Sequence, residues 1–116
     1  MQSENHKKTI YAAILGAGTV GTGVYKLCQE MKSEFVQKTG ADLVVKKVLV
    51  RNASKKREGI EDAVLTDNWK EIIEDPEIDI VIEVMGGIEP AKTYIIEALE
   101  AGKQIVTANK DLLAER

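Results

Sequence analysis

Three glycines at positions 16, 18 and 21 follow an apolar run and precede a helical pattern, in the segment GAGTVG. When G-x-G-x-x-G joins a strand to a helix, it is typical of a turn that binds the pyrophosphate of a dinucleotide. Gly16 would allow the tight turn, Gly18 would let the backbone approach the phosphates, and Gly21 would let helix and strand pack closely. A glycine-rich loop without a ligand is the alternative. Because of the strand–helix context, we expect the three glycines to bind a coenzyme at the amino end of the helix.

The end of the second predicted strand indicates which dinucleotide is preferred. An NAD site usually places an acidic residue there, to accept hydrogen bonds from the ribose 2′-hydroxyl. This chain has Arg51 and Asn52 instead, followed by Lys55, Lys56 and Arg57. The planar guanidinium of Arg51 suits a 2′-phosphate. A solvated basic loop is the alternative for at least two of these four cations. NADP(H) is therefore favoured as the coenzyme, and NAD(H) stays open.

Two further turns follow later predicted strands, at the sheet edge where ligands of α/β proteins bind. The turn VMGGIEP (84–90) contains Gly86 and Gly87. Its glycines suit either a close approach to the coenzyme or the entry into a helix, and the sequence does not separate the two. The turn TANK (107–110) would bring Lys110 to the cleft, where a lysine can hold a substrate oxygen or transfer a proton. A solvated surface lysine is the alternative.

The elements that would position these groups alternate along the chain. Short apolar runs predict strands, and apolar residues at spacings of three and four predict helices. The predicted strands are 9–15, 42–52, 63–66 (short), 77–87 and 103–110, and the helices are 19–40, 67–75 and one from Pro90 to about residue 101. This alternation predicts an α/β fold, a Rossmann-type doubly wound parallel sheet of strand order 3-2-1-4-5 with helices on both faces. Residues 9–116 would form this one domain after a disordered polar tail, 1–8.

Apolar stripes predict how the helices pack. On the first helix the stripe includes Cys28, which we therefore expect to be a small core residue rather than a reactive thiol. Its other members are Val20, Val24, Leu27, Met31 and Phe35. On the second helix Asp67 is the expected N-cap and Trp69 a packing anchor. On the last helix the stripe is Ala91, Ile95, Ala98 and Leu99.

Composition excludes several classes of function. The chain has 116 residues, is 44% hydrophobic and 30% charged, and carries a net charge of −3, which gives no electrostatic footprint for nucleic acid. No apolar stretch is long enough for a membrane span, and the start MQSENHKK lacks the apolar segment of a secretory signal. The single cysteine excludes an intrachain disulfide and offers no metal site. A cytoplasmic protein follows, without membrane or nucleic-acid partners.

These residues also carry a family resemblance. The segments GAGTVGTGV, VRN and IDIVIEVMGGIEPAKTYIIEALEAGKQIVTANKDLLA together resemble the amino-terminal nucleotide-binding part of homoserine dehydrogenase. The resemblance covers almost all of the chain beyond the polar tail, but about a third of such an enzyme. It implies NAD(P)-dependent interconversion of L-aspartate 4-semialdehyde and L-homoserine, on the route from aspartate to threonine, isoleucine and methionine.

The resemblance also implies roles for particular residues. The pyrophosphate would be held by Ala17, Gly18, Thr19 and Val20. Arg51 would hold the ribose phosphate, although many members carry Asp where this chain has Asn52, which leaves the coenzyme preference open. Lys110 would be one of two active-site lysines, near the nicotinamide and the reacting oxygen. The second lysine, the substrate-holding acids and the dimer-forming sheet would belong to a following domain, so the whole enzyme would be a homo-oligomer.

The last residues suggest how the chain relates to such an enzyme. Leu112 and Leu113 stand in a helical start that stops at Arg116, as expected of a fragment. Such a fragment would keep half of the coenzyme site and lack turnover. Two alternatives remain: another two-domain NAD(P)-dependent oxidoreductase, and a non-catalytic nucleotide-sensing module complete at this length.

Overall fold

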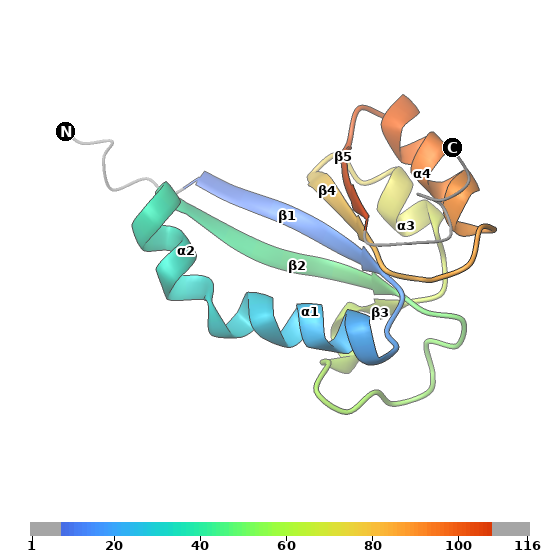
Figure 1. Ribbon diagram of the computed structural model, residues 1–116, viewed down its shortest axis with the longest axis horizontal. Coiled ribbons are helices and arrows are strands. Elements are labelled where there is room, and N and C mark those ends of the chain that lie inside the picture. Colours follow the sequence, from blue (N-terminus) through green and yellow to red (C-terminus); the bar gives the residue numbers. More distant parts are fainter. Residues whose placement is uncertain (1–7, 108–116) are drawn as a thin grey trace.

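The centre of the molecule is a parallel five-stranded sheet with the order β3-β2-β1-β4-β5 (Figure 1). The computed structural model describes residues 8–107. The strands are β1 (Lys8–Leu15), β2 (Ala41–Leu49), β3 (Leu65–Thr66), β4 (Ile78–Glu83) and β5 (Gln104–Thr107). The predicted order 3-2-1-4-5 is confirmed. Of the predicted tail, Lys8 already belongs to β1, and residues 1–7 lie outside the described part.

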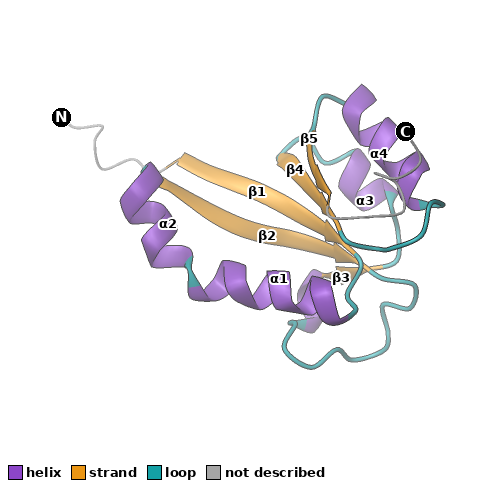
Figure 2. Cartoon of the chain, viewed as in Figure 1, coloured by secondary structure: helices purple, strands orange, loops and turns teal. Residues whose placement is uncertain are grey.

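Helices lie on both faces of the sheet, as the doubly wound fold requires (Figure 2). They are α1 (Thr19–Glu30), α2 (Lys32–Thr39), the 3-10 helix η2 (Asp62–Val64), α3 (Lys70–Ile73) and α4 (Ala91–Glu100). Figure 1 shows α1 and α2 alongside β1 and β2, with α3 and α4 beside β4 and β5. Within residues 8–107, no helix combines the length and the apolar character needed to cross a membrane.

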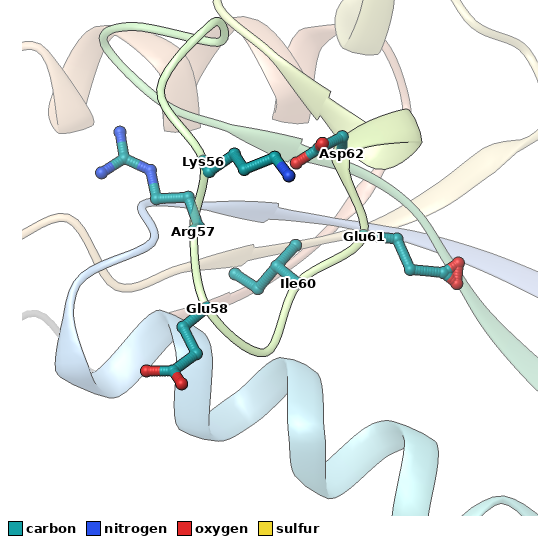
Figure 3. Close-up of a pocket in the computed structure, with 6 residues that line it drawn as sticks. All are labelled: Lys56, Arg57, Glu58, Ile60, Glu61 and Asp62. Carbon is teal, nitrogen blue, oxygen red and sulfur yellow. The ribbon is translucent and has the colours of Figure 1, made fainter.

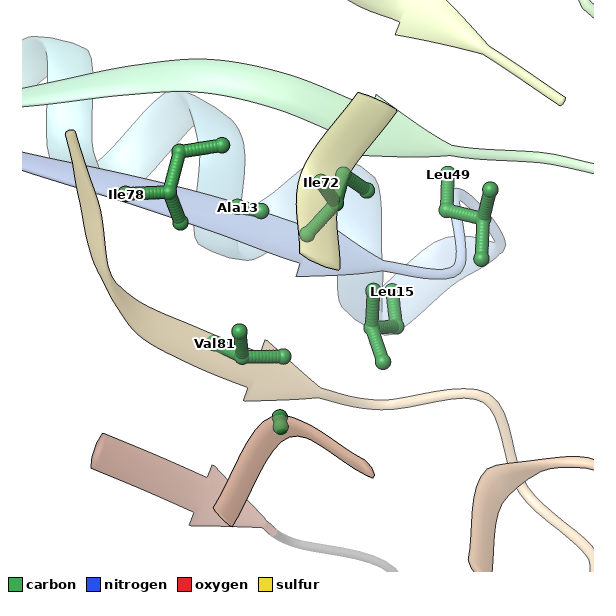
Figure 4. Packing of buried hydrophobic residues seen from close by; sticks show 7 residues of the cluster. Ala13, Leu15, Leu49, Ile72, Ile78 and Val81 are labelled. Atoms are coloured by element: carbon green, nitrogen blue, oxygen red, sulfur yellow. The ribbon is translucent and has the colours of Figure 1, made fainter. Parts of the chain in front are cut away.

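Two apolar cores lie on opposite faces of the sheet, because successive side chains of a strand point to opposite sides. Ala13 and Leu15 of β1 join the core under α3 and α4, together with Ile72 of α3 (Figure 4). Ile14, between them in sequence, joins the other core with Tyr25 of α1. A strand buried on both faces explains why β1 is an unbroken apolar run over residues 10–15.

Two β-bulges interrupt the regular alternation near the middle of the sheet. Ala12 of β1 pairs with Val45 and Ala13 pairs with Lys47, so Lys46 has no partner in β1. On the other side of β1, the pairing skips Asp79 of β4 in the same way. The extra residue in β2 lets Val45 and Val48, three positions apart, enter the same core. The extra residue in β4 does the same for Ile78 and Val81.

The helix predicted over 19–40 is two helices, and its predicted stripe is wrong in part. The chain changes direction at Met31, between α1 and α2, and α2 packs against β2. The residues of α1 buried against the sheet are Gly21 and Tyr25, whereas Val20, Leu27 and Met31 are exposed. Gly21 packs against Gly16, and this contact sets the rotation of α1.

The face of α1 that points to the sheet also includes two members of the predicted stripe. Cys28 is partly buried and packs with Val24 against the core that contains Tyr25. Its burial raises the pKa of the thiol, which fits a packing residue rather than a nucleophile.

The second predicted helix is shorter than expected and has a different cap. The backbone N–H of Lys70 donates to the side-chain oxygen of Asn68, so Asn68 satisfies the start of α3 and the predicted cap Asp67 is wrong. Trp69 is the predicted packing anchor. Its ring stacks on Tyr94 of α4 at 4.4 Å between ring centroids, and its indole N–H donates to Glu97 at 2.7 Å.

The last helix, α4, begins one residue after the predicted start, with Pro90 as its N-cap. Ala91 and Ala98 are buried as predicted, but Leu99 is exposed and its predicted packing is wrong. The strand before α4 ends at Glu83, four residues earlier than predicted. Residues 84–90 therefore form a turn at the carboxyl edge of the sheet.

Candidate functional site

A cleft opens at the carboxyl edge of the sheet, where the turns after β1, β2 and β4 meet. It is lined by Gly16, Ala17, Gly18, Leu49, Val50, Arg51, Arg57, Asp67, Val84, Met85, Gly86, Glu89, Pro90 and Tyr94. Five of these are predicted site residues that come from three separate turns: Gly16, Ala17, Gly18, Arg51 and Gly86. The fold therefore brings the predicted glycine turn, the arginine after β2 and the first glycine of the later turn to one cleft.

The glycine turn after β1 has the geometry that its spacing predicts. Gly16 has φ +109°, a conformation that favours glycine, and its N–H donates to the Leu49 carbonyl at 2.9 Å. A Cβ on Gly21 would overlap the Gly16 carbonyl oxygen, so only glycine allows α1 to approach this closely. A Cβ on Gly18 would meet no atom within 4 Å. Gly18 therefore leaves open space beside the backbone, on the side of the cleft.

The amino end of α1 is open to a ligand. Gly18 is its N-cap and supplies no side-chain hydrogen bond, and the first turn contains no acidic residue. The hydroxyl of Thr22 donates to the Ala17 carbonyl at 3.0 Å, which holds the turn against the helix. The first N–H groups of a helix have no partner within the helix and attract anions. In α1 these groups border the cleft.

The amino end of α4 borders the same cleft but is already occupied. Glu89 accepts hydrogen bonds from the Thr93 backbone N–H at 3.2 Å and from the Thr93 hydroxyl at 2.7 Å. This carboxylate supplies negative charge at the start of α4, where the helix dipole favours it. Of the two helix ends at the cleft, α1 is the one that offers its N–H groups to another molecule.

Two arginines after β2 contribute positive charge to the cleft. Arg51 is exposed, and within residues 8–107 its side chain makes no hydrogen bond or ion pair. Arg57 is partly buried, and its Nε has no hydrogen-bond partner in the described part of the chain. Burying an unpaired guanidinium N–H is unfavourable, so this atom is suited to an anionic ligand.

A second depression is lined by Arg57 together with Lys56, Glu58, Ile60, Glu61 and Asp62 of the same segment (Figure 3). In Figure 3 the side chains of Lys56 and Asp62 point toward one another, and Arg57 points away from both. The depression has charges of both signs and no candidate ligand. The predicted basic loop therefore divides, with Arg51 and Arg57 lining the cleft and Lys55 and Lys56 outside it.

The other predicted site residues lie beside the cleft or outside the described part. Thr19 and Val20 form the exposed first turn of α1, Gly21 is buried beneath it, and Gly87 follows the lining residue Gly86. Lys110 lies outside the described residues.

Sequence reasoning missed several residues at this edge. Asp67, Glu89 and Tyr94 line the cleft, and Glu83 lies buried at the end of β4. Their place at the cleft depends on elements distant in sequence that meet at this edge, although Glu89 also has a local partner in Thr93. For Glu83, one signal was available: an acidic residue at the end of an apolar strand calls for a buried partner.

Comparison with known proteins gives the family. A family model described as "Homoserine dehydrogenase, NAD binding domain" matches residues 16–116. Homoserine dehydrogenase of Bacillus subtilis is 45% identical over 108 residues, covering 92% of this chain and 25% of that protein. The Lactococcus lactis enzyme is 49% identical over 111 residues, covering 91% of this chain and 26% of that protein.

Solved structures agree with the sequence comparison. A crystal structure of S. aureus homoserine dehydrogenase superposes with a TM-score of 0.87 at 44% identity, over 92% of this chain and 27% of that one. The enzyme from Thiobacillus denitrificans gives a TM-score of 0.86 at 38% identity, over 94% and 25%. The chain thus spans about a quarter of the length of the relatives it matches. These matches agree with the glycine turn and the open amino end of α1. The chain therefore belongs to the homoserine dehydrogenase family and corresponds to its NAD-binding domain.

Proposed function

We propose that the cleft binds a nicotinamide dinucleotide with its pyrophosphate at the amino end of α1. The observation that carries this proposal is the contrast between the two helix ends at the cleft. Glu89 already occupies the start of α4, whereas α1 begins at Gly18 with no side-chain cap among residues 8–107 and with open space beside the Gly18 α-carbon. The residues present fit the coenzyme, since a pyrophosphate needs backbone donors and close approach to the chain.

We further propose that the chain prefers NADP(H) to NAD(H). Arg51 follows β2 at the place where an acidic residue would select the free ribose of NAD. Arg57 adds a second guanidinium on the same side, with a buried Nε that lacks a partner among the described residues. Two planar guanidinium groups can form charge-assisted hydrogen bonds with the oxygens of a 2′-phosphate. Asp67 also lines the cleft, and an acid near the ribose would instead favour NAD(H).

For the whole protein, the proposed reaction is the interconversion of L-aspartate 4-semialdehyde and L-homoserine. The coenzyme supplies or accepts the hydride. The described residues would contribute its binding: α1 would hold the phosphates, and the turn over residues 84–90, which lies against Gly16, lines the cleft beside it. Lys110, outside the described part, is proposed to exchange a proton with the substrate oxygen. A cytoplasmic location and a homo-oligomeric assembly stay predictions.

Titration of the chain with each coenzyme tests the proposal. NADPH fluorescence should rise or shift on binding, and NADH should bind more weakly at the same ionic strength. Free pyrophosphate should compete with both, because both share the site at α1. Failure of both coenzymes to bind at millimolar concentration would overturn the binding proposal. Equal dissociation constants for the two would overturn only the preference.

A further inference from the structure

A carboxylate is completely buried where β4 ends. The side chain of Glu83 is 0% exposed, and it does not line the cleft. Acidic side chains are almost never fully buried unless they are paired, because removing a charge from water is costly. The position of Glu83 therefore requires an explanation in terms of the groups that it contacts.

Both carboxylate oxygens of Glu83 accept hydrogen bonds. The backbone N–H of Met85 donates to Oε2 at 2.8 Å, and the hydroxyl of Thr107 donates to Oε1 at 2.6 Å. Glu83 and Thr107 are opposite each other in the pairing of β4 with β5. The carboxylate therefore links the turn after β4 to the last residue of β5.

Both linked groups belong to segments that matter for the cleft. Met85 and its neighbour Gly86 line the cleft, and the Met85 backbone packs against Gly16 of the glycine turn. Gly86 has φ +79° and directly follows Met85, the residue whose N–H Glu83 holds. Thr107 is the last residue before the segment that leads to Lys110.

A second buried polar side chain, at the amino ends of the strands, offers a comparison. Lys103 is also buried, and its ammonium donates to the carbonyls of Asp75 and Ile78, at 2.8 and 2.6 Å. These carbonyls lie before and at the start of β4, far along the strand from the cleft. Lys103 thus satisfies backbone groups away from the site, whereas Glu83 acts on a wall of the site.

We propose that Glu83 is a positioning residue, which fixes the Met85–Gly86 wall of the cleft against the end of β5 in the shape that accepts the coenzyme. It acts through Met85 and Thr107 and does not touch the ligand. This inference rests on the proposed coenzyme binding, and it assigns a specific role to a residue that lines no part of the cleft.

Four substitutions test the link. Glu83→Met removes both hydrogen bonds at similar volume, and Thr107→Val removes one without changing the shape of the side chain. Thr107→Ser keeps the hydroxyl. Lys103→Met is the matched control. It also removes a buried polar group and lowers stability, but at the amino ends of the strands, away from the cleft. Dissociation constants for NADPH are measured well below each variant's melting temperature.

We expect Glu83→Met to raise the NADPH dissociation constant about tenfold or more and Thr107→Val to raise it roughly threefold, as lost hydrogen bonds to a charged group would. Thr107→Ser and Lys103→Met should stay within about twofold of wild type, since neither breaks the link. Adding Thr107→Val to Glu83→Met should cost less affinity than Thr107→Val costs in the wild type, because its bond to Glu83 is already gone.

The outcomes distinguish the positioning role of Glu83 from the coenzyme binding on which it rests. A wild-type chain that binds neither coenzyme overturns the proposed function. A wild-type chain that binds, with folded Glu83→Met and Thr107→Val variants of unchanged affinity, overturns the positioning role alone. An equal loss of NADPH affinity in Lys103→Met would also overturn it, since general destabilisation would then explain the loss. If Glu83→Met fails to fold, Thr107→Val decides. Unchanged NADPH affinity in that variant contradicts the proposal, and the predicted loss of NADPH affinity supports it.

Discussion

Gly21 lies against Gly16 so closely that a Cβ on Gly21 would overlap the carbonyl oxygen of Gly16. The contact joins the first turn of α1 to the end of the turn that follows β1. It fixes the rotation of α1 about its axis, which places Tyr25 in the core and leaves Leu27 exposed. The glycine spacing thus determines packing as well as access to the cleft.

Replacing Gly21 with alanine should destabilise the fold by about 1–3 kcal/mol or more, because the added methyl group forces backbone apart. Gly23 is the matched control, since it lies in the same helix and a Cβ there would meet nothing within 4 Å. Gly23→Ala should stabilise the protein by roughly 0.5–1 kcal/mol through helix propensity. Chemical denaturation measures both. Similar changes in the two variants would contradict the proposed close contact.

Replacing Gly18 with valine should abolish coenzyme binding and leave a cooperative thermal transition. The new side chain meets no protein atom near its Cβ, so the fold tolerates it, but it fills the space where the pyrophosphate would approach. Thermal denaturation and NADPH titration on the same sample distinguish the two effects. Normal binding by the variant would mean that Gly18 serves only the turn.

Replacing Arg51 with alanine should weaken NADPH binding by roughly 1–3 kcal/mol and affect NADH much less, because a charge-assisted contact to the 2′-phosphate is lost. Lys55→Ala serves as the control, since Lys55 is an exposed cation of the same loop that does not line the cleft. Isothermal titration with both coenzymes provides the measurement. Equal losses for NADPH and NADH would remove Arg51 from the 2′-phosphate site.

The stability of the protein should depend on pH through Asp75. The ammonium of Lys46 lies 2.6 Å from Oδ2 of Asp75, and this hydrogen bond lowers the pKa of the Asp75 carboxyl. The same contact raises the pKa of Lys46. A depressed carboxyl pKa means that Asp75 stabilises the fold above its unfolded pKa and that this contribution is lost as pH falls through the folded pKa.

Asp75→Asn should therefore lower the melting temperature near neutral pH, and the difference from wild type should shrink below about pH 4. Between about pH 4 and neutral pH, the difference in melting temperature should stay constant, since Lys46 remains charged throughout. The exposed Asp79 provides a control, since Asp79→Asn makes the same substitution at a carboxylate that forms no ion pair within residues 8–107. Melting temperatures recorded from pH 3 to neutral test this, and a difference that persists at low pH would assign the effect to something other than the ion pair.

The chain by itself should bind NADPH without oxidising it in the presence of aspartate semialdehyde. Its described residues supply walls for the coenzyme, and relatives are about four times as long. Absorbance at the reduced-nicotinamide band follows the reaction, with a full-length relative as the positive control. Measurable turnover by residues 1–116 would refute the proposal that this chain holds part of an active site.

Local patterns were enough to predict the architecture. The alternation of apolar runs and helical stripes predicts a parallel sheet, and right-handed connections leave few strand orders. The glycine spacing predicts the turn after β1. The strand predicted over 42–52 would include Arg51, but β2 ends at Leu49, so Arg51 stands in the loop that follows it. The rotation of α1 could not be predicted from apolar spacing, because a backbone contact between Gly16 and Gly21 determines it.

Long-range polar contacts could not be predicted either. Glu83 and Thr107 are 24 residues apart, and their hydrogen bond depends on the pairing of two strands at a particular register. The same is true of Trp69 and Glu97, which are 28 residues apart. The sequence identified Trp69 as a packing residue by its type, but it contained no signal for the partner.

The bulges at Lys46 and Asp79 have a consequence for the evolution of the family. Each bulge adds one residue to a strand beside β1. Because of that residue, the buried side chains before and after the bulge face the same core. Deleting either residue would shift every later side chain of its strand to the opposite face. Insertions and deletions in β2 or β4 should therefore be strongly selected against, and alignment gaps among relatives should fall in loop segments such as residues 52–56, where a change in length does not reverse the faces of a strand.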